Sequence, residues 1–170
     1  MCYFEWLKAV GPIAIALAVF FVTVWFYRWQ KRLATEKLRH DLYERRFAIY
    51  VAFRDLLLAL PDLAKSDDEI KAACRKASIA RFEALFLLDD PKIQAYLEDL
   101  CRQANGVIGD IVFLDATKKQ PAWTNDPQVV RDVLERSQRL GAAKLDLPNR
   151  HLEELPQRFT QFLRLTDFLK

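Results

Sequence analysis

Apolar side chains form one uninterrupted run near the start of the chain. Residues 9–27 carry no charge and lie between Lys8 and Arg28. These 19 residues, wound as a helix, are long enough to cross the roughly 30 Å hydrocarbon core of a bilayer. The pattern therefore predicts a transmembrane helix over 9–27, with a short periplasmic tail over 1–8.

The next segment has the spacing of a helix that is buried on more than one side. No glycine or proline occurs between Pro12 and Pro61, so we expect the first helix to continue past the apolar run, with Ala34-Thr35 as its weakest point. Beyond the run, apolar residues recur every three or four positions in two stripes. The first stripe is Leu38, Leu42, Ile49, Phe53, Leu56 and Leu60, and the second is Tyr43, Phe47, Tyr50 and Leu57. Two stripes favour the central helix of a bundle.

Three start signals predict the later helices. Ser66 followed by Glu69 is a capping box, and Asp90-Pro91 and Asp126-Pro127 each combine an N-cap with a proline at the first helical position. The first of these helices carries Ile70, Ala73, Cys74, Ala77, Phe82 and Leu85 as its apolar side, up to Leu88. The second carries Ile93, Tyr96, Leu97, Leu100, Cys101, Ala104, Val107, Ile108, Ile111 and Leu114. Both sets predict amphipathic helices.

The end of the chain predicts two more segments. A loop is expected over 117–125, which contains Pro121 and Trp123, and the helix after Asp126 is expected to end at Gly141. A last element over 155–168 carries Phe159, Phe162 and Phe168, which we expect to pack back onto the bundle. No segment alternates apolar and polar residues as a half-buried strand does.

These patterns give an all-α fold, in which an N-terminal transmembrane helix continues into a cytoplasmic bundle of about four to five helices. The domain assignment is a tail over 1–8, a transmembrane helix over 9–27, a basic juxtamembrane stalk over 28–36 and a helical bundle over 37–170.

Charge sets the expected orientation and most of the expected contacts. The chain has a net charge of only +3, which gives no reason to expect nucleic acid as a partner. Eight basic and three acidic residues lie between Arg28 and Arg54, however, so the excess follows the apolar run directly. Positive charge there places the C-terminal side in the cytoplasm, with the lipid bilayer as a partner. The residues expected at the membrane interface are Trp6, Trp25, Tyr27, Arg28, Trp29, Lys31 and Arg32.

A cleaved signal peptide is the alternative to an anchor. It is disfavoured because the run ends in bulky aromatic residues where cleavage needs small side chains. Within the run, Gly11, Ala14 and Ala18 form a stripe of small residues that suits association with another helix.

Candidate chemistry is sparse. We expect no catalytic residue, no metal ligand and no cofactor, because no C-x-x-C, H-E-x-x-H, P-loop or G-x-G-x-x-G pattern occurs. Neither His40 nor His151 is preceded by an arginine at the spacing of the Arg–His motif of a HEPN-type RNase. Cys74 and Cys101 fall within helical patterns and are expected in the core.

One segment has a specific resemblance. Residues 37–50 read KLRHDLYERRFAIY, which is similar to the K-L-R-x-D-L-[FY]-[DE]-[KR]-R-[FY] signature of an uncharacterised group of small bacterial single-pass membrane proteins. In that group the signature follows the transmembrane helix, and residues 82–90 and 158–165 also resemble it. The sequence departs from the group at His40, where an apolar residue is expected. The resemblance implies an inner-membrane topology and supplies no catalytic residues.

Two classes of function remain open on these observations. The first is a membrane-anchored scaffold or regulatory module, not an enzyme, that binds a protein partner or associates with itself. The second is a small oligomerising effector, of a phage-defence or toxin type, that perturbs the bilayer. The aromatic content of the first helix fits either class.

Overall fold

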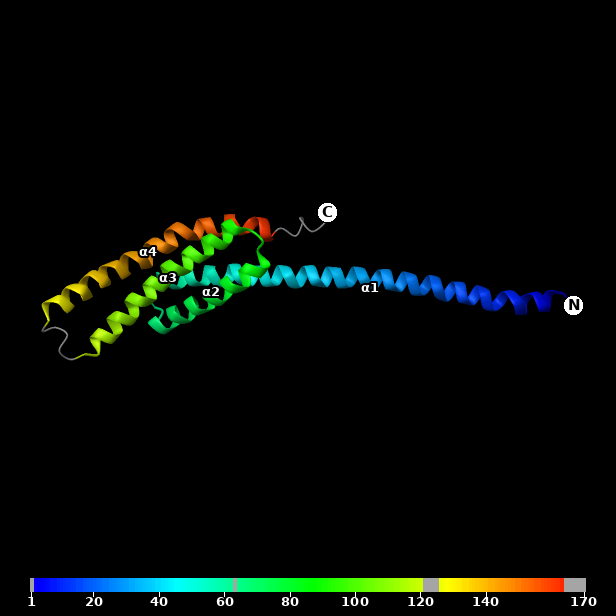
Figure 1. Ribbon diagram of the computed structural model, residues 1–170, viewed down its shortest axis with the longest axis horizontal. Helices are drawn as coiled ribbons and strands as arrows, with labels where there is room; N and C mark the ends of the chain where they lie inside the picture. Colours follow the sequence, from blue (N-terminus) through cyan, green and yellow to red (C-terminus); the bar gives the residue numbers. More distant parts are fainter. Residues whose placement is uncertain (1, 63, 121–125, 164–170) are drawn as a thin grey trace. The chain divides into compact units, whose positions relative to one another are not determined.

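Four helices make up the described part of the chain, which is residues 2–62, 64–120 and 126–163 of a computed structural model, with side chains described from Ala16 onward. They are α1 (Cys2–Ala59), α2 (Asp67–Leu87), α3 (Pro91–Lys118) and α4 (Pro127–Leu163) (Figure 1). No strand occurs among these residues, so the predicted all-α fold is confirmed. The chain divides into two compact units, 1–41 and 42–170, and each is described by itself.

The first unit is a single stretch of α1. Large apolar side chains are exposed along it, including Phe20, Phe21, Trp25 and Trp29. The helix continues through Ala34-Thr35 without a break, as predicted, and the Thr35 hydroxyl donates a hydrogen bond to the Lys31 carbonyl oxygen at 2.8 Å.

The predicted localisation is wrong. In the described part of the chain, no helix contains a segment that is both long enough and apolar enough to cross a bilayer. The earlier residues of the run and the 1–8 tail lie outside the described side chains. The single-pass inner-membrane assignment is therefore withdrawn.

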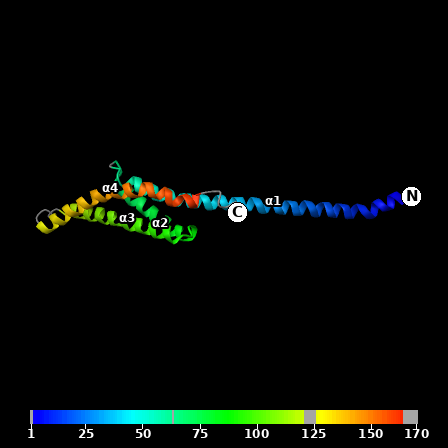
Figure 2. The same cartoon turned by 90° about the horizontal axis from the view of Figure 1, so that it is seen from above.

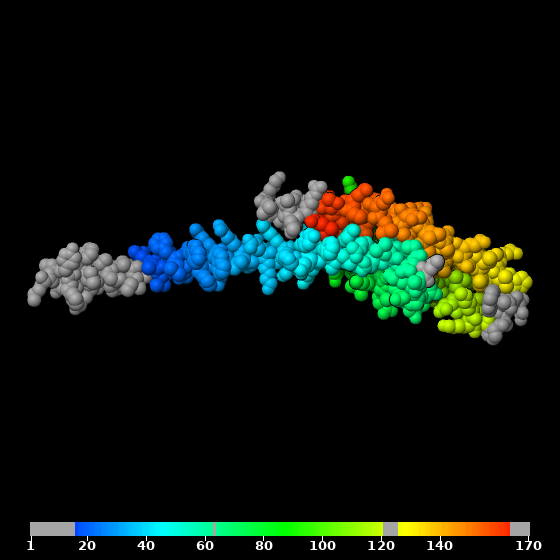
Figure 3. Space-filling view, turned by 180° about the vertical axis from the view of Figure 1, so that it is seen from behind, coloured from blue at the N-terminus to red at the C-terminus, as the bar shows by residue number. Residues whose placement is uncertain are grey.

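The second unit is a helical bundle with one continuous core. α3 packs against both α2 and α4 (Figures 1 and 2). The C-terminal part of α1 lies beside α4, which is orange to red in Figure 3, and the Tyr50 and Phe159 rings meet there with centroids 5.6 Å apart. The largest fully buried side chains are Ile49, Phe53, Leu56, Leu57, Leu60, Ile70, Leu88, Ile93, Leu97, Leu100, Ile111 and Phe159. All four helices contribute to this core.

Helix starts lie where the capping signals predict them. Ser66 accepts a bond from the Glu69 backbone N–H, and the Glu69 carboxylate accepts one from the Ser66 backbone N–H at 2.8 Å. Asp90 accepts from the Lys92 N–H, and Asp126 accepts from the Gln128 N–H, each at 2.8 Å. Each cap satisfies a backbone donor that the first helical turn leaves unpaired.

The end of the chain differs from the prediction. α4 does not end at Gly141 but runs on to Leu163, through Pro148 and Pro156. The described part of the bundle therefore has four helices, and no separate element begins between residues 155 and 163. Each internal proline removes one helix hydrogen bond. Burial of Leu155 after Pro148, and of Phe159 after Pro156, offsets this loss, because both side chains enter the common core. Pro121, Trp123 and Phe168 lie outside the described residues.

Most predicted core positions are buried or partly buried, and four are exposed. The apolar face of α3 is confirmed, with Ile93, Leu97, Leu100 and Ile111 fully or almost fully buried. The exceptions are Leu38 and Phe47 on α1 and Phe82 and Leu85 on α2, all of which are exposed. The two on α2 share one face of that helix.

Candidate functional site

The interface residues predicted from sequence all lie in the first unit. Trp25, Tyr27 and Trp29 are exposed on α1, and so are the basic side chains of this set, Arg28, Lys31 and Arg32. Trp6 lies outside the described side chains. Their assignment to a membrane interface depended on the withdrawn span and is not pursued.

The predicted helix-association stripe is only partly described. Ala18 is exposed on α1, whereas the side chains of Gly11 and Ala14 lie outside the described set. The stripe therefore stays a prediction.

The largest apolar side chains of α2 point away from the bundle core. Ile79, Phe82 and Phe86 are 57%, 56% and 88% exposed, and Leu85 is about half exposed. We call these four residues the outer face of α2. A contiguous exposed apolar surface of this kind is typical of a site that binds another protein.

Small side chains occupy the opposite, core-facing side of the same helix. Ala77, Ala80 and Ala84 are buried, and the Cys101 Sγ on α3 lies 4.0 Å from the Ala77 carbonyl oxygen. Small residues at these positions let α2 and α3 approach closely. Ile70 and Cys74 are buried on the same side, nearer the start of α2. The large apolar side chains further along the helix lie on its outer face.

A groove runs beside the outer face, between α2 and α3. It has a volume of about 650 Å³ and is lined by Phe82 together with charged residues of both signs. Arg81 lies 3.7 Å from Glu98 across it, and Arg102 pairs with Asp99. Because the charges balance, the groove has no marked preference for an anion or a cation.

A buried carboxylate joins α3 to α4. Asp110 is only 6% exposed and accepts two hydrogen bonds from Arg139, at 2.7 and 2.9 Å, and one from Arg136 at 3.2 Å. The hydrogen bonds from Arg139 hold the pKa of Asp110 below its usual value. The Arg136 guanidinium also lies 4.1 Å from the centre of the Phe113 ring, so the cluster ties two helices together.

A second polar cluster joins the same two helices further along. The Tyr96 hydroxyl and the Nδ1 of His151 are 3.1 Å apart, and the Arg158 guanidinium lies 4.4 Å from the centre of the Tyr96 ring. Burial raises the pKa of Tyr96 above its usual value. His151, expected near a loop, is instead buried within α4, where its Nε2 is shielded from solvent. The arrangement therefore favours a packing role for this pair over a catalytic one.

The two described cysteines are core residues, as predicted. Cys74 and Cys101 are buried and unpaired with each other. Burial raises the pKa of the Cys74 thiol to about 11, so little reactive thiolate is present at neutral pH.

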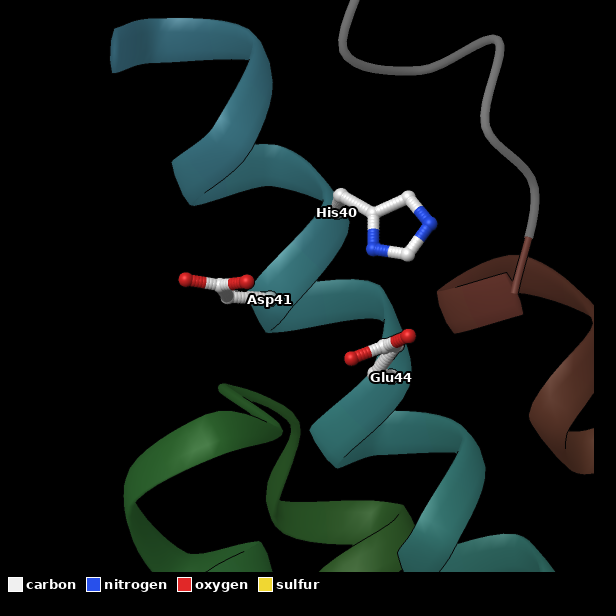
Figure 4. A group of neighbouring side chains, drawn as sticks. All are labelled: His40, Asp41 and Glu44. Atoms are coloured by element: carbon white, nitrogen blue, oxygen red, sulfur yellow. The ribbon is translucent and has the colours of Figure 1, made fainter.

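One group of possible metal ligands was not identified from sequence. His40, Asp41 and Glu44 lie on neighbouring turns of α1, and one potential ligand atom from each lies within 4.8 Å of the others. His40 and Glu44 point to the same side of the helix and Asp41 points away (Figure 4). The four-residue spacing of His40 and Glu44 is the signal that could have indicated this group. All three are exposed, and exposed polar side chains at this spacing are ordinary on a helix surface.

Comparison of the chain with protein-family models, with curated proteins and with solved structures finds no match. The resemblance of residues 37–50 to a group of small bacterial proteins therefore stays a prediction.

Proposed function

We propose that this chain is a helical protein-interaction module and that the outer face of α2 is its binding surface. The observation that carries the proposal is the exposure of Ile79, Phe82, Leu85 and Phe86 on one helix whose other face is buried through alanines. Leaving such a surface in water is unfavourable by about 25 cal/mol for each Å² of apolar area. A bound partner removes that penalty.

The polar clusters of the bundle support an interaction role over an enzymatic one. Asp110 is occupied by Arg136 and Arg139, and Tyr96 and His151 contact each other within the packed interior. Neither cluster combines an exposed nucleophile with a neighbouring base. A bilayer-perturbing effector would require membrane insertion and is not proposed.

The test uses a photo-reactive residue on the outer face. We would replace Phe86 by p-benzoylphenylalanine in the full chain and irradiate cells of the organism that encodes it. The matched control is the same replacement at Leu145, an exposed apolar position on α4.

We expect discrete protein adducts from position 86 that are lost when Phe82→Asp is added, and no such adducts from position 145. Equal labelling at the two positions, or no adduct at position 86, would contradict the proposed function.

A further inference from the structure

We infer that the partner of the outer face of α2 is α2 of a second copy of this chain, packed antiparallel to the first. The inference rests on the proposed function, because it names the occupant of that same surface. It follows from the spacing, the order of charges and the apolar area of the helix.

The exposed residues of α2 follow the spacing of a two-helix seam. Ala72, Ile79 and Phe86 are exposed at intervals of seven residues, and Arg75 and Phe82 are exposed at the same interval between them. Alternating steps of three and four residues keep side chains on one stripe and are typical of helices that pack along their length. α2 thus presents a complete seam away from its own bundle.

An antiparallel register brings large side chains of the seam together. When the two copies are centred between residues 80 and 81, Ile79 of each copy lies beside Phe82 of the other. Phe86 then lies beside Arg75 of the other copy, so that a guanidinium can cover each ring. A parallel register would place the two copies of Arg75 against each other at the seam.

The charges that flank the seam select the same orientation. Lys76 and Glu83 are exposed on one edge of the stripe, and the antiparallel register puts Lys76 of each copy near Glu83 of the other. Within its own copy the Lys76 ammonium lies 3.8 Å from an Asp55 carboxylate oxygen, and both side chains are well exposed. This long, exposed ion pair leaves Lys76 able to contact Glu83 of the other copy. Because the basic Lys76 precedes the acidic Glu83 along this edge of the seam, the edge complements its own reversed copy.

The exposed aromatic area of α2 supplies less than half of what a standard dimer interface buries. An aromatic side chain can bury 150–250 Å², so Phe82 and Phe86, at 56% and 88% exposure, offer about 300 Å² per copy. A standard interface buries roughly 800 Å² per partner. Ile79, Leu85 and the flanking charged side chains enlarge this surface, so we expect an interface smaller than the standard size.

Disulfide trapping tests the register directly. In a Cys2→Ser background we would produce two differently tagged full-length chains, one with Arg75→Cys and one with Phe86→Cys, in the same cells and oxidise them. The buried Cys74 and Cys101 stay in place. The control pair carries Ser137→Cys, at an exposed position of α4, in both chains.

An antiparallel dimer cross-links the mixed pair and not either variant with itself. Residues 75 and 86 are 11 positions apart, about 16 Å along a helix, whereas a disulfide needs Cα atoms within about 7 Å. Self-linking of Arg75→Cys, or cross-linking equal to that of the Ser137→Cys control, would overturn the inference.

Exchanging the charges at positions 76 and 83 gives a second test of the register, read as the yield of the same mixed cross-link. Lys76→Glu or Glu83→Lys alone should lower the yield of the mixed cross-link roughly tenfold, because two ion pairs become two repulsions. The double variant, with the signs exchanged, should restore it. Failure of the double variant to do so would contradict the register.

The outcomes separate this inference from the proposed function. If the photo-reactive residue at position 86 captures only a different protein and the mixed disulfide does not form, the outer face of α2 is a binding surface but its occupant is not a second copy. If neither experiment yields a product, both proposals fail.

Discussion

Replacing Phe53 by alanine should be among the most damaging single changes to the second unit. Phe53 is completely buried in the core of the bundle, as its place in the α1 stripe predicts. Burial of such a side chain contributes about 1.5–3 kcal/mol, and the cavity left behind raises the total loss to about 3–5 kcal/mol. That is a large part of the 5–15 kcal/mol by which domains are stable.

The buried thiols provide an assay that reports on this unit alone. In a Cys2→Ser chain, alkylation of Cys74 and Cys101 requires the core to open. In moderate urea a loss of 3–5 kcal/mol should speed their labelling by about two to three and a half orders of magnitude, since 1.4 kcal/mol is a factor of ten.

Phe86→Ala is the matched control, because it removes the same atoms from a side chain that is 88% exposed. It should change stability by less than about 0.5 kcal/mol. Because Phe86 lies on the proposed dimer seam, the comparison is made at several protein concentrations. A labelling rate for Phe53→Ala within about fivefold of the parent, or equal effects of the two variants, would refute the assignment of Phe53 to the core.

Two further substitutions test the contact between α3 and α4 and the N-cap of α2. Asp110→Asn should reduce the free energy of unfolding by about 1–3 kcal/mol at pH 7, since it removes the carboxylate that accepts from Arg139. Because the pKa of Asp110 is lowered from 3.8, its contribution is present above that pH and is lost as the pH falls through the lowered pKa. Urea midpoints should therefore converge between parent and variant in acid, and a constant difference would contradict this. Ser66→Ala should cost about 1 kcal/mol by removing the α2 cap, measured by urea denaturation against Ser137→Ala, which should have almost no effect.

Local chemistry made the helix starts and the α3 core face predictable. Ser66 with Glu69, and Asp90 before Pro91, act through bonds within one turn of chain, so no tertiary contact is needed to identify them. The α3 pattern is similarly direct, because one face of that helix is almost wholly apolar and becomes almost wholly buried. The all-α class followed from these signals.

The candidate site could not be predicted in the same way. Both sides of α2 carry apolar residues, and periodicity alone does not say which side faces the core. We predicted that Phe82 and Leu85 face inward, whereas the buried side of this part of α2 is formed by alanines. The Cys101 Sγ of α3 lies 4.0 Å from the Ala77 carbonyl oxygen on that side. Which face remains outside is a property of the packed pair of helices.

The sequence by itself determined that this chain is helical and where α2, α3 and α4 begin. It also determined that Phe53 and the apolar face of α3 are core positions. Both followed because hydrogen bonding within a turn and apolar periodicity are local properties of the chain. Only the tertiary structure decided that α4 continues through Gly141, Pro148 and Pro156 to Leu163. The same holds for the exposure of Phe86 on the outer face of α2. Both depend on burial against other helices. In α4 this burial outweighs the local helix-breaking signals of glycine and proline, and in α2 it selects which of the two apolar faces packs inward.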